Sequence, residues 1–406
     1  MRLLTFTTLY PNAVTPQRGI FVETRLRKLI AAGDISASVV APVPWFPFSA
    51  RCFGRYADLA RVSHFETRFG IAVEHPRYPS VPKIGMNMAP SLLCRWTLPV
   101  LARHLTGGHD FDLIDAHYLY PDGVAAVALG RALARPVVLT ARGSDLYTLA
   151  RFPIPRRLML RAARQAAGLI AVSEALRARL VELGVEESRI AVLRNGVDLE
   201  LFHPTPRDAS RTESRLTGPV FLSVGNLVPL KGHDIAIAAL ARIPGATLLI
   251  VGSGPERARL ERLARTLAVS ERVRFLGSLP QGDLPGVYSA ADALILASSH
   301  EGWPNVLLEA MACGTPVVVN NFDSAGEIVR NQAAGRIMAT RSPEAAASAL
   351  AALLANPPSR EATRRYAEGF GWDDTVRAQK AVYAAALARR GAGGDATLGA
   401  RAVVNE

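Results

Sequence analysis

Short runs rich in valine, isoleucine and leucine alternate along the chain with longer segments of helical periodicity. Helices that connect the strands of a largely parallel sheet give this pattern, so a doubly wound α/β architecture is predicted. The strands expected in the first half lie near residues 3–8, 38–41, 113–116, 137–140, 169–172 and 190–193. The pattern restarts at Val220, and the strands expected in the second half lie near 220–225, 247–251, 273–276, 293–297 and 316–319.

Chain length and composition indicate two globular domains. A chain of 406 residues exceeds one ordinary hydrophobic core, and 49% hydrophobic with 20% charged residues is a normal globular balance. A polar, proline-containing segment at 202–210 separates the two halves. An amphipathic helix to about residue 388 is expected after Phe370, and a tail rich in glycine and alanine follows from Gly391.

The cysteines and the N-terminus indicate a cytoplasmic protein. Cys52, Cys94 and Cys313 are odd in number, far apart and without a C-x-x-C pair, so neither a disulfide framework nor a zinc site follows. The apolar run that begins at Met1 is short, is broken by threonines and lacks a small-residue cleavage site, which favours a first β-strand over a signal peptide. No stretch approaches ~20 continuous apolar residues, so no transmembrane helix is predicted.

The net charge of +12 would suit either a nucleic-acid partner or an anionic membrane surface. Lysine occurs at only four positions, so arginine supplies nearly all of the positive charge. Because these arginines are spread over helices rich in alanine and leucine, the charge alone does not decide between the two partners.

The stretch from Glu301 to Val319 carries the strongest functional signal. It reads as a loop, a helix beginning at Pro304, a Gly-Thr-Pro turn and a strand. Glu301 then lies in the loop before the helix, and Glu309 lies more than one turn inside it. Free N–H groups at the start of a helix favour anions, so a carboxylate, a phosphate site and a second carboxylate follow one another. A ligand made of a sugar, a pyrophosphate and a ribose matches that order.

This stretch, with its glycines, prolines and asparagine in place, resembles the donor-site signature of the retaining glycosyltransferases of family 4, which have the GT-B fold. The resemblance implies that Glu301 holds hydroxyls of the transferred sugar and that Glu309 binds the ribose diol. It also implies that sugar and phosphate meet the backbone of the residues between them, which are Gly302, Trp303, Pro304, Asn305, Val306 and Leu307. The alternative is chance, since two glutamates at this spacing also occur in ordinary helices, one as a cap and one in a salt bridge.

The loop after the strand at 220–225 carries a second donor motif. Ligands of doubly wound sheets bind outside the carboxyl ends of the strands, so Gly225, Asn226 and Lys231 belong at the binding edge. The family usually has Gly-Arg here and a lysine five residues after the arginine, both on the donor pyrophosphate; Lys231 matches and Asn226 does not. A cation on the pyrophosphate stabilises the departing nucleoside diphosphate. Lys231 could instead be a solvated surface lysine.

A further loop, which begins at Gly252, resembles the family's loop near the nucleobase.

Three loops of the first half carry candidates for the reacting and acceptor sides. Arg142 stands where the family commonly has a histidine near the reacting sugar. It either supplies the phosphate-binding charge that the donor motif lacks or pairs structurally with Asp145. His117 follows a strand and is expected at the cleft, with a core or capping histidine as the alternative. The resemblance places the acceptor side at Arg18 and Gly19, where one of the family's two usual glycines remains.

No metal and no cofactor are expected. Asp110-Phe111-Asp112 is the D-x-D pattern of the other glycosyltransferase fold, but it precedes a strand, at the wrong end of the sheet for a donor. Walker A, H-E-x-x-H and G-x-S-x-G motifs are absent from the sequence, which disfavours kinase, zinc protease and α/β-hydrolase functions.

An aromatic and basic segment occupies the first half of the chain. It runs from Pro42 to Phe48 and continues through Arg51, Phe53, Arg55 and Tyr56. Such a surface suits a membrane interface or a lipid-linked acceptor. An active-site loop packed on its own aromatic side chains would have the same composition.

The sequence therefore predicts an α/β protein of GT-B type, with two Rossmann-like doubly wound domains facing a central cleft. The predicted parts are an acceptor-side domain (1–198), a linker (199–217), a donor domain (218–370), a helix returning to the first domain (371–390) and a flexible tail (391–406).

The predicted activity is metal-independent, retaining transfer of a sugar from a nucleoside diphosphate sugar to a glycan or lipid-linked acceptor. The reaction is expected in the cytoplasm, with peripheral contact at the inner face of the membrane and no nucleic-acid partner. One rival is a nucleotide-sugar epimerase of the same fold, which the Glu301–Glu309 stretch disfavours. The other rival is a non-catalytic basic protein that binds polyanions or membranes, which the departures at Asn226 and Arg142 favour.

Overall fold

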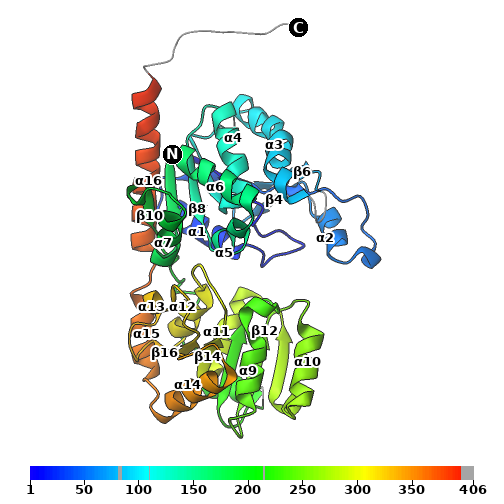
Figure 1. Ribbon diagram of the computed structural model, residues 1–406, viewed down its shortest axis with the longest axis vertical. Coiled ribbons are helices and arrows are strands. Elements are labelled where there is room, and N and C mark those ends of the chain that lie inside the picture. Colours follow the sequence, from blue (N-terminus) through cyan, green and yellow to red (C-terminus); the bar gives the residue numbers. More distant parts are fainter. Residues whose placement is uncertain (81–84, 109, 214, 395–406) are drawn as a thin grey trace. The chain divides into compact units, whose positions relative to one another are not determined.

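The computed structural model describes residues 1–80, 85–108, 110–213 and 215–394 (Figure 1). Contacts between Cα atoms divide the chain into two units, and each unit is built around its own sheet. The first unit comprises residues 1–172, residues 176–194 and the C-terminal helix from Asp374, and the second comprises 173–175 and 195–373. No helix of the described residues combines the length and the apolar character that crossing a bilayer requires.

The first unit contains an eight-stranded sheet in the order β10-β9-β8-β7-β1-β2-β5-β4, in which only β4 and β5 pair antiparallel. Its strands are β1 (Arg2–Phe6), β2 (Ser36–Val40), β4 (Phe65–Arg68), β5 (Ile71–Glu74), β7 (Leu113–His117), β8 (Val137–Ala141), β9 (Gly168–Ala171) and β10 (Ile190–Val192). Two short strands, β3 (Val43–Pro44) and β6 (Arg77–Tyr78), form a separate parallel pair. Every residue of β7 and β8 is buried, as expected of parallel strands covered on both faces.

Helices cover the first sheet as connections between its strands (Figure 1). They are α1 (Ile20–Ala31), α2 (Arg55–Arg61), α3 (Ala89–Thr106), α4 (Val124–Ala132), α5 (Ser144–Tyr147), α6 (Pro153–Gln165) and α7 (Glu174–Glu182). Helices α3, α4 and α6 pack side by side in one layer (Figure 1). Because α6 follows β8, its first residues lie at the carboxyl edge of the parallel sheet.

The second unit contains a six-stranded, wholly parallel sheet in the order β13-β12-β11-β14-β15-β16. The strands are β11 (Val220–Val224), β12 (Thr247–Val251), β13 (Val273–Gly277), β14 (Ala293–Leu296), β15 (Val317–Val319) and β16 (Gly335–Ile337). The helices are α8 (Arg207–Glu213), α9 (His233–Leu240), α10 (Arg257–Thr266), α11 (Leu284–Ala290), α12 (Asn305–Ala312), α13 (Ala325–Ile328), α14 (Pro343–Ala355) and α15 (Arg360–Glu368). Its core joins the apolar faces of α9, α10 and α14 to the central strands.

The prediction of two doubly wound α/β units is confirmed. Each of the eleven strands expected from the sequence is present within two residues of its predicted bounds. The segment expected as a linker, 199–217, belongs to the second unit and contains α8. The strands β3, β4, β5, β6 and β16 were not expected from the pattern.

The C-terminal helix α16 (Asp373–Gly394) packs on the first unit from Asp374 onward. The Lys380 ammonium lies 2.5 Å from the Asp34 carboxylate, and the Arg389 guanidinium donates to the Ala167 carbonyl at 3.0 Å. Residues 391–394, expected in the tail, continue this helix, and the remaining tail residues lie outside the described part of the chain.

Candidate active site

Lys231 and Glu301 form an ion pair in the second unit. Lys231 ends the short turn after β11, Glu301 lies in the loop after β14, and the ammonium is 2.6 Å from the carboxylate. The side chains are only 20% and 11% exposed, so solvent screens the pair weakly. The structure thus brings the predicted pyrophosphate cation and the predicted sugar carboxylate together, although 70 residues separate them in the sequence.

The glycines of the donor loops allow close backbone packing. A Cβ atom on Gly252 would lie 1.9 Å from the carbonyl oxygen of Gly225, so no side chain fits there. The aliphatic stem of Lys231 packs beside Gly225. Asn226 follows on the exposed surface of the loop. The loops after β11 and β12 are therefore fixed against each other beside the Lys231–Glu301 pair.

His233, which the sequence did not mark as a candidate, orders the same loop. It is buried at the start of α9, with Nδ1 2.9 Å from the Ser223 hydroxyl and Nε2 3.3 Å from the Asn226 carbonyl. Burial, with Lys231 nearby, lowers the pKa of His233 to about 4, so the ring is neutral at pH 7. Its Nε2–H then donates to the carbonyl while Nδ1 accepts from the hydroxyl.

The start of α12 differs in detail from the prediction. Pro304 precedes the helix, which begins at Asn305, and the Leu307 amide donates to the Pro304 carbonyl at 3.1 Å. The prediction that the Leu307 amide meets the ligand is therefore wrong, because this N–H closes the first turn of the helix. Gly302 is buried in the preceding loop, and Val306 is half-buried in the first helical turn.

Asn195 supports this helix start from a distant part of the chain. The Trp303 indole donates to the Asn195 carbonyl at 2.9 Å, and the Asn195 amide donates to the Asn305 side chain at 3.1 Å. Nothing in the sequence around Asn195 shows that this residue packs against the start of a helix 110 residues later.

Glu309 lies on α12, half-buried, and accepts a hydrogen bond of 2.7 Å from the Tyr288 hydroxyl. Desolvation raises the pKa of Glu309 to about 7, although the Tyr288 hydrogen bond acts to lower it. The carboxyl is thus near half ionisation at neutral pH. An added hydrogen-bond donor, such as a ribose hydroxyl, would favour the ionised form.

The first unit holds a buried polar chain at the carboxyl end of β7. His117, 1% exposed, lies 3.0 Å through Nε2 from the Asp115 carboxylate and 2.8 Å through Nδ1 from the Arg142 guanidinium. A carboxylate only accepts and a guanidinium only donates, so His117 is the neutral Nε2–H tautomer. Burial lowers the pKa of His117 to about 4, with Arg142 contributing. Both ring nitrogens are occupied, which leaves His117 as a support for Arg142.

Helix α16 and helix α1 complete this chain. Tyr383 interacts with the Asp115 carboxyl, and Gln379 bridges the Tyr383 hydroxyl and the Arg25 guanidinium. All of these side chains are buried. Burial acts to raise the pKa of Asp115, yet His117, Tyr383 and Arg25 together hold that pKa below its usual value, so the carboxylate is charged.

Arg142 is half-buried, and its guanidinium donates to Nδ1 of His117 at 2.8 Å. The Asp145 carboxylate accepts hydrogen bonds from the backbone amides of Leu119, Arg142, Gly143 and Leu146 and so shapes the turn after β8. Burial lowers the pKa of Arg142 to about 9, which still leaves the guanidinium charged at pH 7.

Gly19 and Arg18 lie at the start of α1. Gly19 has a φ of 72°, and a Cβ atom there would lie 2.1 Å from the Leu9 carbonyl oxygen, so the position requires glycine. Arg18 is exposed on the rim of a cavity of about 280 Å³ that Tyr10 and Tyr56 also line.

The aromatic segment is both self-packed and exposed. Phe46, Phe48 and Phe53 pack with ring centroids 5.2–5.9 Å apart: Phe48 and Phe53 are stacked, and Phe46 meets both edge-to-face. Trp45 is 58% exposed. The side chains of Arg51 and Arg55 lie outside the described part.

Asp110 and Asp112 lie before β7 and bind arginines. Arg2 contacts both carboxylates at 3.1 and 2.8 Å, and Arg135 contacts Asp110 at 2.9 Å. Hydrogen bonds from Arg135 hold the pKa of Asp110 below its usual value. Within the described residues, no group of three or more His, Cys, Asp or Glu side chains could hold a metal ion.

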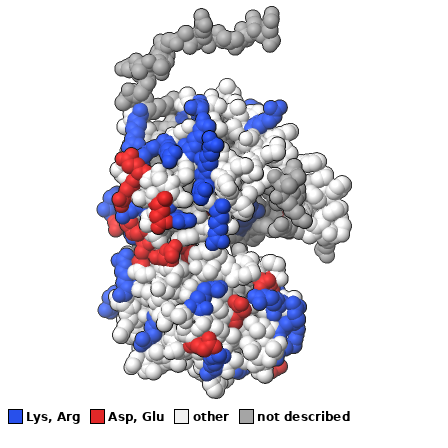
Figure 2. All heavy atoms as spheres, viewed as in Figure 1, with Lys and Arg blue, Asp and Glu red and all other residues white. Residues whose placement is uncertain are grey.

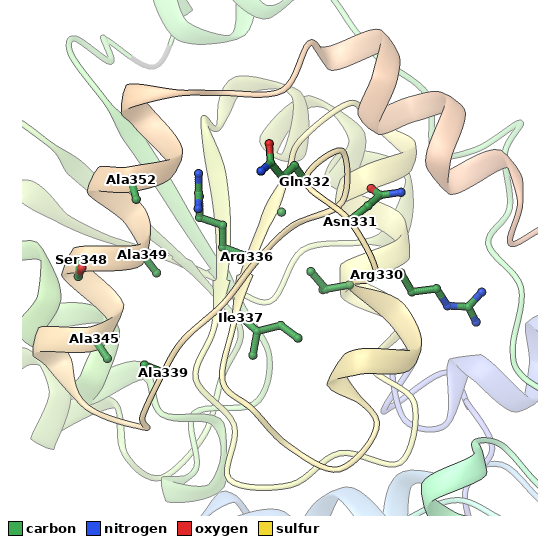
Figure 3. Close-up of a pocket in the computed structure, with 12 residues that line it drawn as sticks. Arg330, Asn331, Gln332, Arg336, Ile337, Ala339, Ala345, Ser348, Ala349 and Ala352 are labelled. Carbon is green, nitrogen blue, oxygen red and sulfur yellow. The ribbon is translucent and has the colours of Figure 1, made fainter.

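A groove of about 480 Å³ lies along the edge strand β16 of the second unit. Arg336 of β16 stands between Arg330 and the alanines of α14 (Figure 3). The described residues that line it include none of the predicted donor residues, so this groove is separate from the Lys231–Glu301 pair.

Two family models match this chain. The model of "Glycosyltransferase Family 4" matches residues 25–201, and that of "Glycosyl transferases group 1" matches residues 205–370. The D-inositol 3-phosphate glycosyltransferase of Frankia alni is 33% identical over 356 aligned positions, and the alignment covers 78% of this chain and 85% of that protein.

Among solved structures, the sucrose-phosphate synthase of Thermosynechococcus elongatus has a TM-score of 0.78 at 20% identity, covering 96% of this chain and 99% of that one. The Anabaena protein Alr3699/HepE, solved in complex with UDP-glucose, has a TM-score of 0.71 at 20% identity, covering 94% and 99%. At such identities these two structures show the fold alone. The two family models together with the Frankia relative show that this chain belongs to glycosyltransferase family 4, with the GT-B fold.

Proposed function

We propose that this protein transfers a sugar from a nucleoside diphosphate sugar to an acceptor hydroxyl, with retention of configuration and without a metal ion. The observation that carries the proposal is the 2.6 Å pair between Lys231 and Glu301. A sugar diphosphate needs a cation at its phosphate and an acceptor for its sugar hydroxyls a few ångströms apart, and this pair supplies both.

The charge of Lys231 serves the leaving group. As the sugar–phosphate bond breaks, negative charge grows on the pyrophosphate, and a cation held in place stabilises it. Donor binding draws Lys231 toward the phosphate and releases the Glu301 carboxylate to accept from sugar hydroxyls. In the same proposal Glu309 accepts from the ribose.

In this proposal Arg142 of the first unit is the second cation that binds the phosphates. It takes the role of the arginine that the family usually has at the position of Asn226. His117 and Asp115 hold the Arg142 guanidinium in position. One imidazole nitrogen of His117 lies 2.8 Å from the guanidinium and the other lies 3.0 Å from the Asp115 carboxylate, so both nitrogens are used. Both nitrogens of His117 and both carboxylate oxygens of Asp145 already take part in hydrogen bonds, so neither side chain is placed to act as a general base. This supports a front-face reaction in which the departing phosphate takes the acceptor proton.

The acceptor is a glycan or lipid-linked alcohol in this proposal, bound near Arg18 and Gly19, and the reaction takes place at the cytoplasmic face of a membrane. The name of the Frankia relative gives a second candidate, an inositol phosphate, which the exposed Arg18 guanidinium would suit. A purely binding role is less supported, since the curated relatives are named as enzymes.

A donor panel tests the proposal directly. Purified protein with EDTA present is offered UDP-, GDP- and ADP-sugars, and release of the diphosphate is measured with and without acceptors. We expect one donor to be turned over in EDTA, and Lys231→Ala to lower its turnover by about 10²–10³-fold. A need for added Mg²⁺ or Mn²⁺ would contradict metal independence, and inversion at the product's anomeric carbon would contradict retention.

A further inference from the structure

Helix α6 presents a surface that the transfer reaction does not use. Between Asp145 and Glu174 the chain has five arginines and no acidic residue. Four of the five, Arg156, Arg157, Arg161 and Arg164, lie on α6 and are exposed. In the view of Figure 2, Lys and Arg form a band over the part of the first unit where α6 lies in Figure 1.

The periodicity of α6 separates this arginine face from the core. At 100° per residue the four arginines fall within an arc of about 140°. The residues that α6 buries are Pro155, Met159, Ala162 and Ala163, which occupy the opposite side. The arginines are therefore not needed for folding of the helix onto the sheet.

These charges are not neutralised by neighbours in the part of the chain that the structure describes. Arg156, Arg157 and Arg161 make no ion pair there, and Arg164 donates only to the Gly184 carbonyl at 3.3 Å. Helix α10 of the second unit differs, because Arg257 pairs with Glu261, and Arg259 pairs with Glu256.

Apolar side chains border the arginine face at one end. Phe152 is 46% exposed and Ile154 is 51% exposed, immediately before and within the first turn of α6. Because α6 follows β8 in a parallel sheet, this end lies at the carboxyl edge, where β8 leads to Arg142. Exposed arginines next to exposed apolar groups match the boundary between anionic headgroups and acyl chains.

We propose that the α6 face docks this protein on an anionic lipid bilayer, with the arginines on lipid headgroups and Phe152 and Ile154 at the acyl boundary. The carboxyl edge of the first sheet then lies next to the bilayer. An acceptor carried by a lipid would be presented at that edge; this last step alone rests on the proposed function.

Vesicle binding by the full chain tests the docking. Partition is measured without donor, on vesicles of phosphatidylcholine alone and on vesicles that also contain phosphatidylglycerol. We expect binding to the anionic vesicles only, weakening as salt is raised. Each arginine near the surface contributes about fivefold to partition, so Arg156→Ala with Arg157→Ala should lower it roughly 30-fold. Phe152→Ser with Ile154→Ser should remove the part of the binding that survives high salt.

Helix α10 provides the matched control. Arg262 and Arg265 are exposed on it, so their replacement by alanine removes the same net charge from another basic helix. This control should leave vesicle binding unchanged. An equal loss in the control would overturn the proposal, because net charge and not the α6 face would then govern binding. Binding to duplex DNA without binding to anionic vesicles would overturn it in favour of a nucleic-acid partner.

The docking and the transfer reaction are separated by their assays. All of the variants change exposed side chains, so the thermal midpoint and donor hydrolysis without vesicles should match the unmutated protein. Vesicle binding with no turnover of any donor would uphold the docking and reject the proposed function. Turnover of a donor without vesicle binding would uphold the proposed function and reject the docking.

Discussion

The ionisation of Glu309 should make donor affinity depend on pH. Desolvation raises the pKa of Glu309 to about 7 in the free protein, and the ionised carboxylate is the form that accepts from a ribose diol. A group with that pKa is about 9% ionised at pH 6 and about 91% ionised at pH 8. The dissociation constant of the bare nucleoside diphosphate should therefore fall about tenfold between these two values, measured by calorimetric titration.

Glu309→Gln provides the comparison, because it keeps the side chain's shape and removes its titration. The diphosphate itself changes charge over this range, so the two proteins have to be compared. Between pH 6 and pH 8 the dissociation constant should fall about ten times more in the unmutated protein than in Glu309→Gln. Tyr288→Phe should move the midpoint to higher pH, since the Tyr288 hydroxyl acts to lower the pKa of Glu309. Parallel pH profiles for the unmutated protein and Glu309→Gln would refute the assignment of Glu309 to the donor.

The remaining predictions concern turnover. Glu301→Ala should reduce turnover while leaving affinity for the bare diphosphate nearly intact, and equal losses of both would contradict its place at the sugar. Arg142→Ala should lower turnover more than it raises the donor dissociation constant, and Asn226→Arg should partly restore the rate in that background; additivity of the two in a double-mutant cycle would show that they do not share the phosphate. Tyr383→Phe should lower turnover without changing donor affinity, because the hydroxyl acts on Arg142 indirectly, through Asp115 and then His117. Tyr366→Phe, which removes a hydroxyl bound to a backbone carbonyl in the second unit, is its control and should change neither.

The parallel strands could be predicted because burial on both faces leaves an apolar run in the sequence. The β4–β5 hairpin could not: the strands are half exposed, and they are joined by Phe69 and Gly70, which both have positive φ without the usual Asn-Gly signal. Strand β16 is three residues long and leaves too short a pattern to recognise.

The donor half of the site could be predicted because its order along the loop and helix matches the order of groups in the ligand. The supporting contacts could not, since packing alone brings together Tyr383 and Asp115, or Trp303 and Asn195. His117 was expected at the binding edge, and the sequence contains no sign that both of its nitrogens would be used internally.

The division of the chain has a consequence for its synthesis on the ribosome. Arg25 is buried in the first unit and contacts Gln379 of α16, a helix that is made after the second unit. About 200 residues separate the end of the first segment at Arg194 from the end of α16. At 5–20 residues per second, translation takes roughly 10–40 s to supply that helix. The second unit is continuous from Asn195 to Asp373 and can fold in this interval, so the first unit begins before the second unit and is completed after it.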